Sequence, residues 1–157
     1  MDTAAANGLL KPCCLQTWYN LVEREKFEGE LRDTALANGL GVFPFYSLAN
    51  GFLSGKYRTQ ADLAKSMRGA RSAAFLEGRG MAVLSNLDGI AAETGAALAT
   101  IALAWIMAQP GIVAALASAT NVAQLNELTA ALHLKLTSGQ LARLDEASAV
   151  KEPAAAA

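Results

Sequence analysis

Hydrophobic residues form three short runs along the chain, at positions 12–15, 42–45 and 112–117. Apolar runs of this length suit single buried strands. The last run, with the sequence IVAALA, contains no polar residue, which is typical of a parallel strand covered on both faces. The pattern therefore predicts three strands.

Apolar residues at helical spacing predict helices between these runs. The first stripe starts near Glu23, and Gly39 is its stop signal. A second stripe spans residues 81–94, and a third helix spans 97–109, directly before a Pro-Gly pair. The buried face of the first helix is expected to consist of Phe27, Leu31, Ala35 and Leu36.

Two further helices begin with capping pairs. The three-residue spacing of a capping box occurs twice, between Asn121 and Gln124 and between Thr137 and Gln140. The first of these helices is expected to turn four apolar residues inward, namely Val122, Leu125, Leu128 and Leu132. Residues 59–80 show no clean period and predict a long connection, which carries Lys65, Arg68, Arg71 and Arg79.

The order of these elements predicts the fold class. Strands alternate with helices, which is typical of parallel βαβ units and of an α/β protein. We expect the strands near Cys13, Val42 and Val113 to lie parallel in one sheet, with the helix 97–109 packed on it. A three-stranded sheet has two open edges, so exposed apolar surface and self-association are expected.

Composition narrows the class further. The chain has 157 residues, of which 53% are hydrophobic, and this predicts one domain with a sizeable core. The net charge is -1 and no basic block occurs, so neither nucleic acid nor an anionic membrane surface is an expected partner. The most apolar run, residues 96–108, is shorter than the ~20 residues that a membrane-spanning helix needs. We expect a cytoplasmic protein with a frayed tail over residues 149–157.

Only two cysteines occur, and they are adjacent, at Cys13 and Cys14. Adjacent cysteines make poor disulfide partners and do not have zinc-site spacing. Both are expected to pack as small core residues in a reducing cytoplasm, and a reactive thiol is the alternative.

The candidate chemistry lies in residues 41–58, GVFPFYSLANGFLSGKYR. A short strand delivers an aromatic residue to a loop in which Gly51 and Gly55 allow close approach to a ligand. Lys56 and Arg58 follow, and both are donors that a phosphate would need. This favours a dinucleotide-binding corner, although neither the G-x-G-x-x-G nor the Walker A pattern occurs. An ordinary strand followed by a surface loop is the alternative.

Several motifs, in order, together resemble the aldo/keto reductase family. Residues 16–24 are similar to its sixth-strand motif, and residues 41–58 to its seventh strand and following loop. Residues 102–111 resemble the penultimate helix, and 117–127 resemble the cofactor loop of the eighth strand. The family fold is a TIM barrel of typically ~250 residues. The resemblance therefore implies a partial (β/α)8 barrel, its C-terminal part with about three strands, as a single domain over 1–157.

The resemblance also implies an NADP(H) site. Gln16 would bond the nicotinamide carboxamide, and Phe45 would replace the family's stacking tyrosine. The pyrophosphate would be bordered by Ser47, Leu48, Gly51 and Lys56, with Arg58 nearby. The adenosine phosphate would meet a strand exit and helix start at Ser118, Ala119, Thr120 and Gln124.

The chain departs from the family pattern at some of these positions. Tyr46 and Ser47 stand where many relatives have Ser-Pro, and Leu128 stands where many have an adenine-binding Asn. Ser118 or Gln124 replaces cations found in some branches.

No position matches the family's catalytic Asp, Tyr, Lys and His, which come from earlier strands. His133 is expected at the surface, and Tyr19, Tyr46 and Tyr57 lie inside cofactor-half motifs.

Three interpretations follow from the sequence. The first is the C-terminal, NADP(H)-binding part of an NADPH-dependent carbonyl reductase, inactive alone and acting on a small carbonyl substrate only once the barrel is completed. The second is a stand-alone nucleotide-binding or regulatory module. The third is a degenerate, truncated gene product without activity.

Overall fold

Two parallel strands form the sheet. The computed structural model describes residues 1–150. Strand β1 (Cys14–Trp18) lies beside β2 (Gly41–Phe45), in register from Cys14 opposite Gly41. The connection between them runs through a helix, as parallel pairing requires. The predicted α/β class and the parallel pairing of the first two strands agree with this arrangement.

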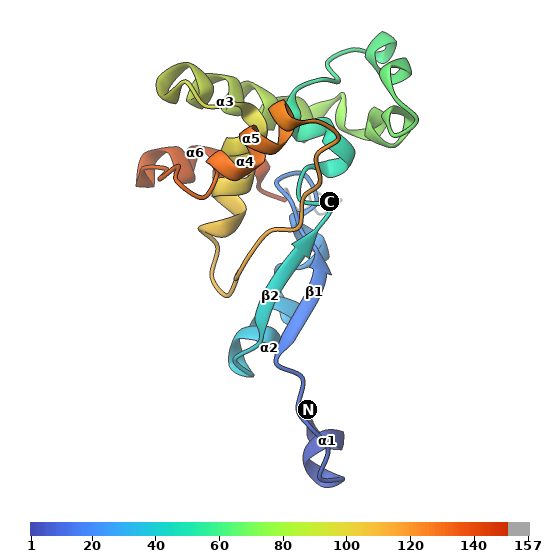
Figure 1. Cartoon of the computed structure of the whole chain (residues 1–157), viewed down its shortest axis with the longest axis vertical. Coiled ribbons are helices and arrows are strands. Elements are labelled where there is room, and N and C mark those ends of the chain that lie inside the picture. Colours follow the sequence, from blue (N-terminus) through green and yellow to red (C-terminus); the bar gives the residue numbers. More distant parts are fainter. Residues whose placement is uncertain (151–157) are drawn as a thin grey trace, which may run out of the picture.

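Helices occupy most of the remaining chain. Figure 1 shows α2 (Glu30–Ala37) beside the strands, the helices α3 to α6 gathered beyond the carboxyl ends of the strands, and α1 (Asp2–Ala6) at the opposite end. The elements outside the sheet are α1 (Asp2–Ala6), η1 (Arg24–Lys26), α2 (Glu30–Ala37), η2 (Ala49–Ser54), η3 (Gln60–Lys65), η4 (Gly69–Phe75), α3 (Gly78–Thr94), α4 (Leu98–Met107), α5 (Val122–Ala130) and α6 (Ser138–Ser148).

The third predicted strand does not form within residues 1–150. Ile112 makes one isolated parallel bridge with Val42. The Val42 amide donates to the Gly111 carbonyl at 2.9 Å, and the Val113 amide donates to the Val42 carbonyl at 2.9 Å. The side chain of Val113 is 61% exposed, because no described element covers its outward side. The expectation of a third, doubly covered strand is therefore wrong for this segment, which follows β2 without forming a continuous ladder.

The core lies between the helices and the segments that follow the strands. Its largest fully buried side chains include Tyr19, Phe27, Phe52, Tyr57 and Trp105. The apolar stripe predicted for residues 81–94 is confirmed, since its Leu84, Leu87 and Ile90 are buried on α3.

Helix α4 is almost fully buried, and it packs against α3, α5 and η2. It was expected on the sheet. Its contact with the strand region is instead made by Trp105, whose ring centroid lies 5.5 Å from that of Tyr19, directly after β1.

Several positions that were expected to be buried are exposed. Leu31 is 42% exposed, although Phe27 and Ala35 on the same stripe are buried. Val122 on α5 is 72% exposed, whereas Leu128 is partly buried. The other residues of this kind are Cys13, Cys14, Leu36, Leu125 and Leu132. These positions are exposed because their outward sides have no packing partner within residues 1–150.

A polar network connects the segment after β1 to the last helix. The Tyr19 hydroxyl donates to Glu28 at 2.6 Å, and Arg24 Nε donates to the same carboxylate at 2.7 Å. Arg24 also donates to Ser148 and Asp145 on α6. Burial, and then the adjacent Glu28 carboxylate, raise the pKa of Tyr19 above its usual value. The network therefore keeps Tyr19 as a neutral donor and fixes α6 against the start of the crossover.

Within residues 1–150, no helix is by itself long and apolar enough to cross a bilayer. Helices α3 and α4 meet that criterion only as a pair, and they are bent by 100° relative to each other.

Candidate functional site

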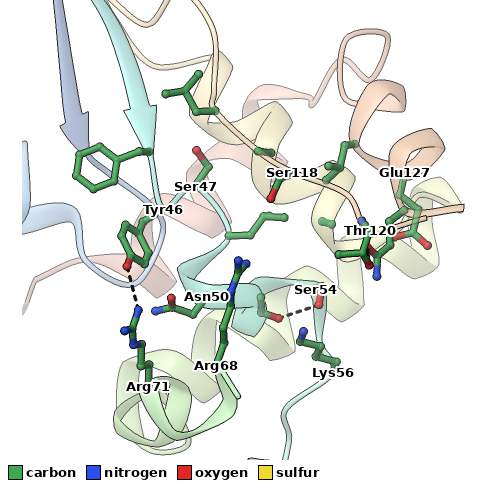
Figure 2. Close-up of a pocket in the computed structure, with 18 residues that line it drawn as sticks. Tyr46, Ser47, Asn50, Ser54, Lys56, Arg68, Arg71, Ser118, Thr120 and Glu127 are labelled. Carbon is green, nitrogen blue, oxygen red and sulfur yellow. Dashed lines mark hydrogen bonds between the residues drawn. The ribbon is translucent and has the colours of Figure 1, made fainter. Parts of the chain in front are cut away.

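A cavity of about 760 Å³ opens beyond the carboxyl end of β2 (Figure 2). Its walls come from the loop after β2, from η2 and η4, from the start of α4, and from the stretch that leads into α5. This volume lies in the range typical of small-molecule sites, and ligands of α/β proteins bind at the carboxyl ends of strands. The cavity is therefore the candidate functional site.

The loop after β2 has an unusual backbone. Tyr46, Ala49 and Asn50 all have positive φ values, of 59°, 47° and 58°. Gly51 follows with φ 92°, and a Cβ atom there would lie 2.8 Å from Cε of Lys56. Only glycine avoids both the backbone strain and the contact. The loop can therefore bring its backbone and Lys56 together at the cavity wall.

Three cations line the cavity: Lys56, Arg68 and Arg71. Within residues 1–150, no carboxylate lies at ion-pair distance from any of them, and their side chains are exposed. Lys56 Nζ lies 4.8 Å from the ring centroid of Tyr57. The wall formed by η2 and η4 therefore has positive charge available for an anion.

The buried Tyr57 hydroxyl shares a 2.5 Å hydrogen bond with Ser66. Burial acts to raise the pKa of Tyr57, but that hydrogen bond and the charges of Lys56 and Arg68 outweigh it and hold the pKa below its ordinary value. The Ser66 hydrogen bond is the main cause of this shift, and the charges of Lys56 and Arg68 act in the same direction.

The opposite wall is polar and largely uncharged. Gln124 Oε1 accepts from the Thr120 amide at 2.9 Å and from the Thr120 hydroxyl at 3.0 Å. The backbone N–H of Gln124 donates to the side-chain Oδ1 of Asn121 at 2.9 Å, which confirms that Asn121 caps α5. Ser118 is exposed at the same wall, and Glu127 is its one carboxylate among the described lining residues. This wall offers hydroxyl and amide groups to a ligand.

Most of the residues predicted for the cofactor lie around this one cavity. From the seventh-strand motif these are Phe45, Ser47, Leu48, Gly51 and Lys56. From the eighth-strand motif they are Ser118, Thr120 and Gln124. Segments about 70 residues apart in the chain therefore face each other, as the resemblance implies. Ser47 is buried, and its hydroxyl donates to the Pro44 carbonyl at 3.1 Å.

Three predicted residues do not line the cavity. Gln16 is exposed on β1, and Ala119 lies next to the lining residues without joining them. Arg58 donates two hydrogen bonds to Asp88 on α3, at 2.5 Å and 2.7 Å. The guanidinium of Arg58 is therefore committed to a carboxylate and does not face the cavity.

The sequence did not indicate some of the lining residues as site residues. Arg68 and Arg71 were noted only as cations of the long connection, and spacing alone could not place them opposite Ser118. Tyr46 lies inside a cofactor-half motif and departs from the family pattern, and neither observation predicts contact with a ligand. Its ring stacks on Trp18 with centroids 4.2 Å apart and planes 9° apart. Residues 1–150 contain no cluster of side chains suited to a metal ion.

A comparison with protein-family models gives one result that covers most of the chain. The model described as the aldo/keto reductase family matches residues 1–149.

Two curated relatives illustrate the similarity. A probable voltage-gated potassium channel subunit beta from Arabidopsis thaliana is 31% identical over 124 residues, which are 76% of this chain and 38% of that protein. The L-glyceraldehyde 3-phosphate reductase of Escherichia coli K12 is 30% identical over 139 residues, which are 83% of this chain and 40% of that protein. The chain thus spans about two fifths of the length of these relatives.

Proposed function

The chain belongs to the aldo/keto reductase family, an oxidoreductase family that generally uses NAD(P)H, and on that premise we propose that its cavity binds NADP(H). In this proposal the chain is the C-terminal, cofactor-binding part of a carbonyl reductase. The observation that carries it is the cavity beyond β2, which is lined by two motifs distant in the sequence and by three cations, none of which pairs with a carboxylate within residues 1–150.

The residues present fit the cofactor. Its pyrophosphate needs positive charge and close backbone approach, which Lys56, Arg68 and the loop at Gly51 supply. A nicotinamide ring needs a flat apolar surface, and Phe45 is half-buried at the cavity wall. The adenosine end needs hydroxyl and amide partners, which Ser118 and Gln124 offer.

Carbonyl reduction divides the chemistry between the cofactor and the protein. The bound cofactor supplies a hydride, and the protein must orient the ring and provide a proton donor. In this chain Phe45 would orient the ring, while Lys56 and Arg68 would hold the phosphates. The proton donor of the family comes from earlier strands, so we propose that reduction requires those strands and that the 157 residues alone only bind.

The test is direct titration of the 157-residue chain with NADPH. Phe45→Ala should weaken binding by about 1 kcal/mol, or about fivefold, because an aromatic stacking surface is lost. Lys56→Ala should weaken it by about 1.5–3 kcal/mol, the range of a hydrogen bond to a charged group. The matched control is Lys26→Ala, which removes an exposed lysine outside the cavity and should leave affinity unchanged. Equal affinities for all four proteins, or no NADPH binding at all, would contradict the proposal.

A second measurement addresses the reaction itself. We expect no aldehyde-dependent oxidation of NADPH by the 157-residue chain with a generic substrate such as nitrobenzaldehyde. Steady turnover would mean that Tyr19, Tyr46 or Tyr57 serves as the acid, or that the chain assembles into a complete site.

A further inference from the structure

Arg71 lies at the end of the row of cavity cations opposite Lys56, with Arg68 between them (Figure 2). In Figure 2 Lys56 lies near Ser54 on one side of the view, whereas Arg71 lies on the other side and reaches toward Tyr46. Arg71 donates through Nη1 to the Tyr46 hydroxyl at 3.3 Å. The guanidinium keeps further N–H groups for a ligand.

Tyr46 is held in place from several directions. Its ring stacks flat on Trp18, and Trp18 Nε1 donates to Glu23 at 2.7 Å. Asn20 donates to the Tyr46 carbonyl at 3.2 Å and also to Glu23 at 3.0 Å. The backbone at Tyr46 has a positive φ, a conformation that persists only where the surroundings fix it. The phenol is thus a positioned hydroxyl at the cavity wall.

Arg71 and Tyr46 lie at the same end of the cavity as Phe45. The rings of Phe45 and Tyr46 have centroids 5.5 Å apart, and both line the cavity. A guanidinium and a phenol together offer several donors, which is what a carboxylate or phosphate group requires. No carboxylate within residues 1–150 pairs with Arg71, so its charge is available.

We propose that Arg71 and Tyr46 form a second anion site, which binds the carboxylate or phosphate of a small acidic carbonyl compound beside the nicotinamide. The substrate assignment rests on the proposed function, since it takes Phe45 as the surface for the nicotinamide ring. Arg71 anchors the anion, and the Tyr46 hydroxyl donates to it once Arg71 turns toward the ligand. The substrate class of the completed enzyme is therefore carbonyl compounds with an anionic group close to the carbonyl carbon.

Inorganic phosphate is the probe for this site. The 157-residue chain is first saturated with NADP⁺, so that the groups that hold the dinucleotide phosphates are occupied, and phosphate is then titrated by calorimetry. Emission of Trp18, which stacks on Tyr46, gives a second readout, with Trp18→Phe as its blank. We expect phosphate to bind the complex and to change this emission.

Variants then assign the binding to named groups. Arg71→Gln should weaken phosphate binding about tenfold, because a charge-assisted hydrogen bond is lost. Arg71→Lys should restore part of the affinity, and Tyr46→Phe should weaken it less than Arg71→Gln. Lys56→Gln is the matched control, which should reduce NADP⁺ affinity while phosphate affinity stays within about twofold. Thermal unfolding of each variant verifies that the fold is retained.

Two results would overturn the inference. One is phosphate affinity that is the same in Arg71→Gln and in the unchanged chain. The other is displacement of phosphate by NADP⁺, which would make Arg71 part of the dinucleotide site. If NADP⁺ does not bind but phosphate binds in an Arg71-dependent manner, the proposed function fails and the anion site stands.

Discussion

At the scale of single residues, Gly51 shows how one position shapes the site. Its φ of 92° strains any L residue, and a Cβ atom there would lie 2.8 Å from Cε of Lys56, so that side chain would have to shift. The same residue therefore permits the turn of the loop and the placement of a cavity cation. The sequence predicted the role of Gly51 as a turn, because glycine is the ordinary solution to such a backbone. The neighbouring positive φ values of Tyr46 and Ala49 carry no such signal in their residue types.

Gly51→Ala should lower stability and disturb the site. An alanine at positive φ costs about 1 kcal/mol, and its methyl group would push Lys56 away from the Tyr57 ring. Urea unfolding and NADPH titration measure the two effects. The control is Gly139→Ala on α6, where nothing lies within 4 Å of the added Cβ atom and φ is not positive. An unchanged free energy of unfolding for Gly51→Ala would contradict the argument.

Arg58 gives a pH-dependent prediction. The hydrogen bond from Arg58 lowers the pKa of Asp88, against a smaller effect of burial. A carboxyl group whose folded pKa is depressed contributes stability above its unfolded pKa, about 3.9, and loses that contribution as the pH falls through the folded pKa. Because both side chains are more than a third exposed, the contribution is at most about 1 kcal/mol.

Asp88→Asn should therefore lower the free energy of unfolding at pH 7 and make no difference once the pH lies below the folded pKa of Asp88. Urea unfolding across this pH range is the measurement. Asp2→Asn on α1, whose carboxylate makes no ion pair within residues 1–150, is the control. A difference between the Asp88 variant and the unchanged chain that persists at low pH would contradict this assignment.

At the scale of elements, the sequence patterns predicted the helices correctly but not the strand expected at residues 112–117. Helices α3 and α4 are apolar segments followed by a glycine or a Pro-Gly pair, and α6 begins at the capping box of Thr137 and Gln140, so local signals predicted them. Residues 112–117 have the composition of a covered strand, but a strand also needs a neighbour on each side. That requirement lies outside the segment, which is why Val113 is exposed despite its pattern.

The network around Arg24 joins the segment after β1 to α6, and a single substitution of Arg24 should disturb it. Arg24→Met leaves Glu28, whose side chain is 20% exposed, and the more exposed Asp145 without their cation, and should cost about 1–3 kcal/mol, since a part-buried carboxylate loses its partner. Arg32→Met is the matched control, because Arg32 pairs with Asp33 at the surface and its loss should cost less than about 0.5 kcal/mol. Urea unfolding compares the two, and similar costs would show that the network does not fix α6.

At the scale of the whole molecule, the family and the cavity could be predicted, but the contacts of the cavity could not. The motifs fix which segments meet, so Phe45 and Ser118 line one cavity as expected. They do not fix side-chain pairing, and Arg58 therefore pairs with Asp88 while Arg68 and Arg71 occupy the wall. Such pairing depends on η4 and α3, elements whose placement has no local sequence signal.

The open sheet predicts association of the molecule. Within residues 1–150, strand β1 has β2 on one side and no strand on the other, and Cys14 on β1 is exposed. Exposed large apolar side chains occur near this region, among them Leu10 before β1 and Val113 beside β2. Unpaired strand edges with apolar surface favour pairing with another chain. We therefore expect the average mass in sedimentation velocity under reducing conditions to rise with protein concentration.

A lysine on the edge strand should suppress this association. Cys14→Lys places a charge on β1, which is a common means by which proteins protect an edge from pairing. Met67→Lys is the matched control, since it adds the same charge at a fully exposed apolar residue of the connection between η3 and η4, away from the sheet. The first variant should sediment as a monomer over a wider concentration range, whereas the second should behave like the unchanged chain. If both variants dissociate equally, net charge rather than the sheet edge governs association, and a stable monomer of the unchanged chain at high concentration would contradict the prediction outright.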